Sequence, residues 1–444
     1  MDTLQARNYI EIRDNNFGTT YAYPLFGVGF CLLGQVKNPC RTHGVFYFST
    51  YKNGGLFMSN CWKDICEKII SNNSSSFYSI PVNILRNGSS YKVGISANVT
   101  VSVYKNPQNQ NDGTTTVTLS GLYEFDTGGP GAYIAFNPNG GSTLGASSSI
   151  ANPIAQVTQG YYSGIQYQAT VAPTVVTLQG LGPAGNLVVP ANVALVTSIT
   201  NTKSDEGVGY NGFPIYEGFY GDFGAALGVV PLTAISPLLA PAVPANPPYM
   251  ISVLAQVIAN GAQQAFMVLL PPASEVGSDP TGYILIGDTA SLLSILSDYG
   301  QFSMGGQKSV NVGASTDVNS YAECLIQDAV LTADVPQSNP QQKRFTPIGV
   351  CFDTGATTTV HPGSNLEVTS DAVSNIALGA STVGGQSWNL IHDRGATTPV
   401  APKPSKNDLQ GYVNTGVEFF MKNAVLYDLA GGNLYVMPYS STNG

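Results

Sequence analysis

Apolar residues that alternate with polar ones constrain the fold of this chain more than any other feature. The pattern is clear in residues 91–96 (YKVGIS) and 99–103 (VTVSV), and it returns in short segments until residue 437. Successive side chains of a β-strand point to opposite faces, so a period of two predicts strands with one buried face. Turn-forming residues are frequent, with 49 Gly and 28 Pro among 444 residues. The sequence therefore predicts an all-β protein.

The expected strands are short and follow one another along most of the chain. They cover residues 46–51, 91–96, 99–103, 116–119, 122–126, 132–136, 165–171, 175–178, 187–200, 265–270, 283–286, 322–331, 348–352, 418–427 and 433–437. Apolar residues at helical spacing predict short helices at residues 62–70 and 250–259.

Charged residues are few. Lys and Arg number 18 and Asp and Glu 27, which is 10% of the chain and a net charge of -9, whereas an average soluble domain has about 25% charged residues. Nucleic-acid binding needs clustered Lys and Arg, so this composition argues against it. The windows 127–202 and 223–274 hold no charged residue. Such a surface has few ion pairs that acid can break, so we expect tolerance of low pH.

Neither a signal peptide nor a membrane span is expected. The first residues, MDTLQAR, are not a basic segment followed by an apolar one. The most apolar run, residues 21–34, contains Pro24 and three glycines and is too short to cross a bilayer.

The six cysteines form no CxxC pair, which argues against a zinc site. Four of them lie within the first 66 residues, where they are either joined in short disulfide loops or remain buried thiols. We expect no metal and no cofactor.

Two segments separated by 227 residues share a pattern that carries chemistry. Residues 123–129 read YEFDTGG and residues 350–356 read VCFDTGA, so in each an apolar strand ends in Phe-Asp-Thr-Gly. Gly permits the turn and the close approach of another backbone. Two such loops facing each other would bring Asp126 and Asp353 together in a cleft of low dielectric, where they share a proton because both cannot readily ionise. One carboxylate can then activate a water molecule while the other polarises a carbonyl group.

These loops resemble those of the pepsin-like aspartic proteases. The resemblance extends over about residues 91–439, and its segments occur in the order of the family. Residues 91–96 resemble the opening strand, 159–165 (QGYYSGI) the flap hairpin that covers the substrate, 221–228 (GDFGAALG) the apolar segment beneath the first catalytic loop, 282–288 the last strand of the first lobe, and 414–428 the closing segment of the second.

The resemblance implies a bilobal pepsin-like fold with an active-site cleft between two related lobes. It implies an aspartic endopeptidase that hydrolyses peptide bonds with a water activated by a shared-proton dyad. The residues it assigns are the catalytic Asp126 and Asp353, the supporting Thr127, Gly128, Thr354, Gly355 and Thr357, and a flap tyrosine at Tyr161 or Tyr162. The implied partner is an extended polypeptide with apolar residues on both sides of the cut, and the implied state is a monomer.

One position departs from the family pattern. Gly129 and Pro130 follow the first DTG, so the hydroxyl that usually stands beside the first Asp is missing. The alternative hypothesis is therefore a non-catalytic pepsin-like protein that binds, inhibits or assembles at a surface, which the Ser-, Thr- and Asn-rich composition suits equally.

We expect three parts: an N-terminal extension at residues 1–86, a first lobe at 87–290 and a second lobe at 291–444. The extension has a charge balance of +3 and the remainder one of -12. It is either a prosegment that acid releases from the dyad or an accessory layer beside the first lobe. The basic residues that could reach the dyad are Lys37, Arg41, Lys63 and Lys68. An acid-active enzyme implies secretion or an acidic compartment.

Overall fold

The computed structural model describes most of residues 76–439. Within that range it leaves out residues 89, 141–142, 162–163, 182, 202–217, 235–248, 260–263, 277–280, 312–316, 337–340, 394 and 403–409. N-terminal to residue 76, it describes six short strands and residues 62, 65, 66 and 69. The chain divides into two compact units, one of residues 68–439 and the other of residues 1–67 with 440–444.

The smaller unit contains three antiparallel strand pairs. They are β1 (Tyr9–Asp14) with β2 (Thr19–Pro24), β3 (Leu33–Gly34) with β4 (Gly44–Val45), and β5 (Phe48–Thr50) with β6 (Leu56–Met58). Strand β5 lies within the predicted strand at 46–51. The basic residues that were expected to reach the dyad, Lys37, Arg41, Lys63 and Lys68, lie outside the described residues, as do Cys31, Cys40 and Cys61. Whether the extension is a prosegment or an accessory layer stays a prediction.

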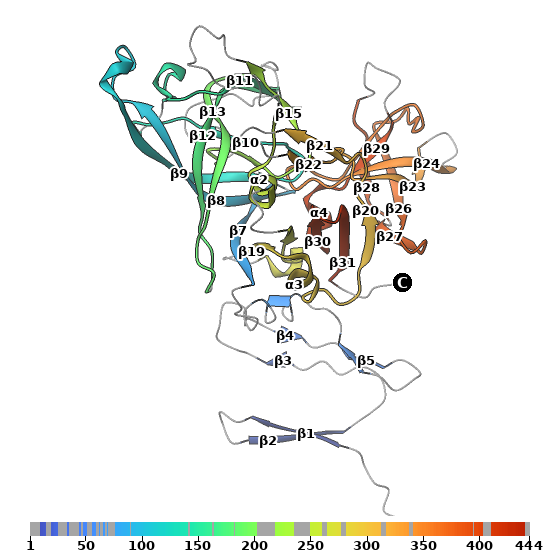
Figure 1. Ribbon diagram of the computed structural model, residues 1–444. Coiled ribbons are helices and arrows are strands. Elements are labelled where there is room, and N and C mark those ends of the chain that lie inside the picture. The colour runs from blue at the N-terminus through green and yellow to red at the C-terminus, as the bar shows by residue number, and fades with distance from the viewer. Residues whose placement is uncertain are drawn as a thin grey trace, which may run out of the picture. The chain divides into compact units, whose positions relative to one another are not determined.

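The larger unit contains a sheet of 14 described strands (Figure 1). Along its hydrogen-bonded path the order is β16 (Thr233–Ala234), β11 (Ala155–Gly160), β12 (Ile165–Leu178), β13 (Leu187–Asn201), β10 (Ala132–Ala135), β14 (Gly221–Gly224), β9 (Thr114–Asp126), β8 (Ser90–Tyr104), β7 (Phe77–Asn87), β19 (Thr281–Gly287), β18 (Ala265–Leu269), β30 (Asn423–Asp428), β31 (Asn433–Pro438) and β20 (Gly300–Ser303). Blue β7 and red β31 therefore belong to one sheet, and the boundary predicted at residue 86 falls at the end of β7.

A second sheet belongs to the C-terminal half. Its order is β25 (Thr359–His361), β29 (Tyr412–Asn414), β24 (Gln341–Cys351), β23 (Ile326–Val335), β26 (Ala372–Ser381) and β27 (Ser387–His392), with β28 (Thr397–Pro399) paired to β26. Two smaller pairs are β15 (Val230–Pro231) with β17 (Tyr249–Met250), and β21 (Lys308–Asn311) with β22 (Asp317–Ser320).

The two halves repeat one arrangement of three strands. In the first half, β14 runs parallel to β9 with Asp222 opposite Glu124, and β10 is antiparallel to β14. In the second half, β29 runs parallel to β24 with Asn414 opposite Cys351, and β25 is antiparallel to β29. Glu124 and Cys351 each lie two residues before the Asp of a DTG loop. The protein is thus all-β with two related lobes, and the predicted pepsin-like fold is confirmed.

Some predicted strands merge or change type. Residues 91–96 and 99–103 form the single strand β8, because β9 pairs with it without interruption from Gly94 to Tyr104. The segment predicted as a strand at 418–427 begins instead as α4 (Gly416–Phe420) before β30. An apolar run buried on all sides lacks the periodicity that separates a helix from a strand.

The other helices are short. The helix predicted at 250–259 is present as α2 (Val253–Ala259), and α3 (Thr289–Leu293) starts where the Asp288 carboxylate accepts a hydrogen bond from the Ser291 N–H at 2.9 Å. In the described part of the chain, no helix has the length and apolar character needed to cross a membrane.

The core runs from one lobe into the other. Phe125 and Phe223 of the first lobe belong to the same buried apolar cluster as Phe352 and Phe420 of the second. All four are at most 2% exposed. This shared core fixes the two DTG loops, which follow directly from Phe125 and Phe352.

Candidate active site

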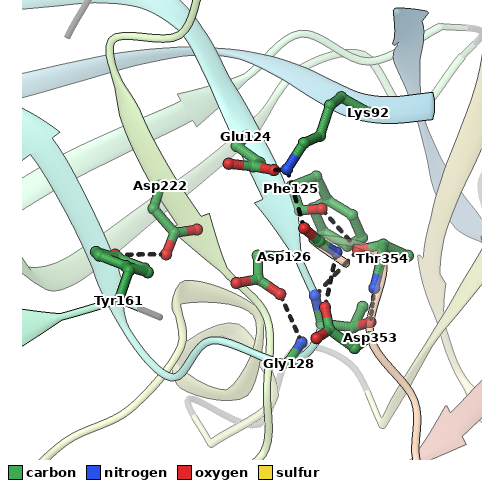
Figure 2. Close-up of polar contacts among 11 residues, drawn as sticks. Lys92, Glu124, Phe125, Asp126, Gly128, Tyr161, Asp222, Asp353 and Thr354 are labelled. Atoms are coloured by element: carbon green, nitrogen blue, oxygen red, sulfur yellow. Dashed lines mark hydrogen bonds and ion pairs between the residues drawn. The ribbon is translucent and has the colours of Figure 1, made fainter. Parts of the chain in front are cut away.

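The two DTG loops bring Asp126 and Asp353 face to face (Figure 2). Each carboxylate accepts a hydrogen bond from the glycine N–H two residues later, Gly128 to Asp126 and Gly355 to Asp353, both at 2.7 Å. A Cβ atom on Gly355 would lie 2.7 Å from the Asp126 Cγ, and one on Gly128 would overlap the Asp353 carboxyl. Only glycine therefore lets each loop approach the opposite carboxylate.

Beneath the carboxylates, Thr127 and Thr354 are buried and interlock the two loops. The Thr127 hydroxyl donates to the Phe352 carbonyl at 2.9 Å and accepts from the Thr354 N–H at 3.0 Å. In return, the Thr354 hydroxyl donates to the Phe125 carbonyl at 2.6 Å and accepts from the Thr127 N–H at 3.0 Å. These four bonds join β9 to β24 and fix the distance between the two carboxylates.

Burial raises the pKa of Asp126 well above its ordinary value, and the nearby carboxylates of Asp353 and Asp222 raise it further. A carboxyl group in this position holds a proton at a pH where an exposed aspartate would be ionised. The pair therefore has the electrostatic character of two acids that share one proton.

Asp353 receives a second hydrogen bond that sequence reasoning missed. The side-chain amide of Asn414 donates to its Oδ2 at 2.6 Å. The resemblance assigned this supporting role to Thr357, but Thr357 is exposed and, among the described residues, its hydroxyl makes no hydrogen bond to Asp353. Asn414 makes the contact instead, because its position on β29 lies beside β24 just before the loop.

The missing hydroxyl at position 129 has a structural cause. A Cβ atom on Gly129 would lie 2.6 Å from the Asp126 Oδ2 and 3.1 Å from the Asp222 Oδ2. The Asp126 and Asp222 carboxyl groups therefore occupy the space that a side chain at position 129 would need. Asp222 occupies the same place in its lobe as Asn414 does in the other, since both lie opposite the residue two before a DTG aspartate.

Restoring the family hydroxyl should therefore harm this site. For the peptide hydrolysis that the family resemblance implies, we expect Gly129→Ser to lower kcat by about tenfold or more, because displacing Asp126 by a fraction of an ångström disturbs the positions of the paired carboxyl groups. Gly384→Ser is the matched control, since a Cβ there meets only the Thr382 Oγ1 at 3.9 Å. Equal or higher activity of Gly129→Ser would show that the loop has room for the hydroxyl.

Asp222 is 5% exposed and takes part in the site although sequence reasoning gave it no role. The Tyr161 hydroxyl donates to its Oδ2 at 2.7 Å (Figure 2). Burial and the Glu124 carboxylate raise the pKa of Asp222 well above its ordinary value. The sequence did contain a sign of this role, because Asp222 is an acidic residue within 221–228, the segment that the resemblance identified as apolar.

Tyr161 directly follows β11, in the segment that connects β11 to β12, and its role as a flap residue stays a prediction. The Tyr161 N–H donates to the Ile165 carbonyl at 2.8 Å, and the Tyr161 carbonyl accepts from the Gly164 N–H at 2.9 Å. Its ring packs edge-on against Tyr167, with 5.1 Å between ring centroids. The alternative flap residue, Tyr162, lies outside the described residues.

A partly buried ion pair lies next to the dyad. The Lys92 Nζ is 2.6 Å from the Glu124 Oε1, and it also donates to the Gly355 carbonyl of the opposite loop at 3.0 Å. Lys92 comes from β8 and Glu124 from β9, so the pair connects the sheet of the first lobe to the DTG loop of the second.

Two cavities flank the dyad, and both Asp126 and Asp353 line each of them. The smaller has a volume of about 230 Å³ and reaches back to Lys92, Glu124 and Asp222. The larger, of about 730 Å³, extends to Glu323 and Tyr321 on the other side. Tyr161 lines both cavities. Among the described residues, no group of three or more His, Cys, Asp or Glu is arranged to hold a metal ion.

Comparison with known proteins gives likeness at the level of the fold. No protein-family model matches the sequence, and no curated protein matches it. Among solved structures, the chain is similar to an aspartic proteinase from Irpex lacteus, with 15% identity and a TM-score of 0.45 over 82% of this chain and 98% of that one. It is similar to basic 7S globulin from soybean at 12% identity and a TM-score of 0.45, covering 82% and 96% of the two chains. For conglutin gamma, a basic 7S globulin from lupine seeds, the identity is 10%, the TM-score 0.45 and the coverage 83% and 95%.

Proposed function

We propose that the chain is an aspartic endopeptidase that hydrolyses peptide bonds with a water molecule activated by Asp126 and Asp353. The observation that carries this proposal is the facing pair of carboxyl groups on two related loops, one with a raised pKa, at the junction of two cavities. An extended polypeptide that lies through both cavities would present a peptide bond to the dyad beneath Tyr161.

The hydrogen bonds indicate which carboxyl carries the proton. Asp353 accepts hydrogen bonds from both the Gly355 N–H and the Asn414 amide, so a donor meets each of its two oxygens. Asp126 accepts from the Gly128 N–H and lies near a second acid, Asp222, which favours its protonated form. In the proposed resting state Asp353 is therefore the base and Asp126 the acid.

The proposed reaction needs no covalent intermediate. Asp353 takes a proton from the water as its oxygen attacks the carbonyl carbon, while Asp126 donates its proton toward the carbonyl oxygen. The resulting tetrahedral species then breaks its C–N bond: the leaving nitrogen takes the proton from Asp353, and one hydroxyl of the tetrahedral species returns a proton to Asp126, which restores the dyad. Both carboxyl groups are held by the backbone N–H bonds and the threonine interlock, so little reorganisation is needed during the reaction.

Activity should be confined to acid. Two carboxyl groups this close lose their protons in two separate steps, and the raised pKa of Asp126 keeps the shared proton in place over an acidic range. As the pH rises through the second step the proton is lost, so kcat/KM should fall above about pH 6. A pH profile of peptide cleavage checks this, and a maximum near pH 8 would contradict the shared-proton mechanism.

A non-catalytic pepsin-like protein is the second candidate, and Gly129 is the observation that favours it. Incubating the protein with an unfolded polypeptide near pH 4 separates the two. Cleavage that pepstatin inhibits supports the endopeptidase, whereas binding without cleavage supports the second candidate. Secretion or an acidic compartment, and a monomeric state, belong to the first proposal.

A further inference from the structure

The smaller cavity has an unusual wall for a pocket beside a catalytic pair. Beyond the dyad, it is lined by the carboxylates of Glu124 and Asp222 and by the single ammonium group of Lys92. In the part of the chain that the structure describes, Lys92 is the one basic residue that lines it. Glu124 is 8% exposed and Asp222 is 5% exposed, so both carboxylates are buried in the pocket wall.

The Lys92 ammonium is already engaged. It lies 2.6 Å from the Glu124 Oε1 and also donates to the Gly355 carbonyl. In Figure 2, Lys92 reaches Glu124 from the side away from Asp222, and the carboxyl groups of Glu124, Asp126 and Asp222 surround a common space. The pocket thus contains more acidic groups than its own cation can balance.

One atom of this pocket has no partner. The Asp222 Oδ2 accepts a hydrogen bond from Tyr161, but its Oδ1 is buried without a hydrogen-bond partner. A buried carboxylate oxygen that lacks a donor costs free energy, and a cationic donor that enters the pocket would recover it. Burial and the Glu124 carboxylate raise the pKa of the Asp222 carboxyl. An ammonium or guanidinium group at hydrogen-bond distance would lower that pKa, so Asp222 would give up its proton as the cation binds.

We propose that this pocket binds the Lys or Arg side chain of a substrate polypeptide, with Asp222 as its main charged partner and Glu124 as the second. The proposal rests on the proposed endopeptidase function and names its substrate class. It departs from the expectation of apolar residues on both sides of the cut, because one of the two cavities beside the dyad is acidic.

The remaining wall suits the stem of such a side chain. Tyr161, Ile165 and Tyr167 line the same cavity and offer apolar surface to the methylene groups. At about 30 Å³ for each water molecule in the liquid, a volume of about 230 Å³ has room for several heavy atoms. The aliphatic stem can therefore lie along the aromatic rings while the charged end reaches Asp222.

The first test compares peptides that differ at one residue. A substrate peptide carries Lys, Arg, norleucine or Glu at each of the four positions nearest to the cut in turn, and kcat/KM is measured between pH 4 and 6. Charged hydrogen bonds contribute about 1.5 to 3 kcal/mol, so we expect Lys or Arg to exceed norleucine by about 10- to 100-fold at one position. A ratio of one or less at every position would overturn the proposal.

Variants then locate the preference. Asp222→Asn should bring the ratio of Lys to norleucine close to one, whereas Glu323→Gln, which removes a carboxylate from the larger cavity, should leave the ratio unchanged. The ratio is the readout because any general change in catalytic competence affects both peptides equally. An unchanged ratio in Asp222→Asn would contradict the assignment, and the wild-type comparison does not depend on the folding of any variant.

A binding experiment separates failure of this inference from failure of the proposed function. Peptides with a hydroxyethylene group in place of the scissile bond, carrying Lys or norleucine on either side of it, are titrated into the full chain by calorimetry. At least about tenfold tighter binding of a Lys peptide supports the pocket even if no peptide is cleaved. Equal affinities, or no measurable binding of any peptide, would overturn the inference, and cleavage without a basic preference would leave only the endopeptidase standing.

Discussion

Asp353→Asn should reduce peptide hydrolysis by at least about 10³-fold, because an amide cannot take the proton from the attacking water. The amide has the size of the carboxyl, but its NH₂ group is a donor and cannot accept a hydrogen bond. The variant therefore loses the bond from either the Gly355 N–H or the Asn414 amide. We therefore expect a loss of about 1 to 3 kcal/mol of unfolding free energy along with the loss of activity. Initial rates at pH 4 and a urea unfolding curve measure the two effects separately.

Asp126→Asn is the companion variant and should be better tolerated by the fold. The amide oxygen can keep the Gly128 N–H bond, and its NH₂ can face Asp353. Activity should fall to a similar extent, because the amide cannot release a proton to the reacting carbonyl. Asp328→Asn, which removes an exposed carboxylate from β23, should retain activity and serves as the matched control. Full activity in either dyad variant would refute the mechanism.

Thr127→Val should destabilise the protein more than any conservative change at its surface. The hydroxyl donates to the Phe352 carbonyl and accepts from the Thr354 N–H, and all three residues are buried. Valine has the same shape but leaves both partners unsatisfied, so unfolding free energy should fall by about 2 to 5 kcal/mol. Urea unfolding at pH 5 measures the change, and loss of the interlock should also lower kcat.

Two further variants test whether the interlock acts as one unit. Thr118→Val removes a hydroxyl that meets Thr100 at 3.1 Å on the exposed face of the β8 and β9 pair, and it should cost less than about 0.5 kcal/mol. The double variant Thr127→Val with Thr354→Val should cost less than the sum of the single changes, because the two residues share one network. Strict additivity would show that the two threonines act independently.

Local sequence patterns predict the parts of this molecule whose structure is specified by residues close together in the sequence. Alternation predicts β8 and β9, and the paired Phe-Asp-Thr-Gly segments predict loops that meet, because each loop carries its own strand, turn and glycine. The hairpin of β11 and β12 came from the resemblance rather than from a local pattern, and the structure pairs these two strands. For the strands and the loops, neighbouring residues are enough to specify the local geometry.

The residues that tune the site depend on strand order and register, which no local pattern contains. Asp222 faces Glu124 only because β14 inserts between β9 and β10, and Asn414 reaches Asp353 only because β29 lies between β24 and β25. The resemblance assigned a supporting role to Thr357 from its place in the second loop, and it gave Asn414 no role. A polar residue inside an apolar strand was the visible signal, but its partner is known only once the sheet is assembled.

The long sheet also determines the order in which the molecule can be completed during synthesis. Strand β30 pairs with β18, about 160 residues earlier in the chain, and β31 then joins β30 to β20. While a ribosome adds residues from the N-terminus onward, the edge of β18 has no neighbour on that side until residue 423 has emerged. Contacts between such distant segments slow folding and leave a strand edge open to other chains. A chain of this design therefore depends on protection of that edge until its last strands are made.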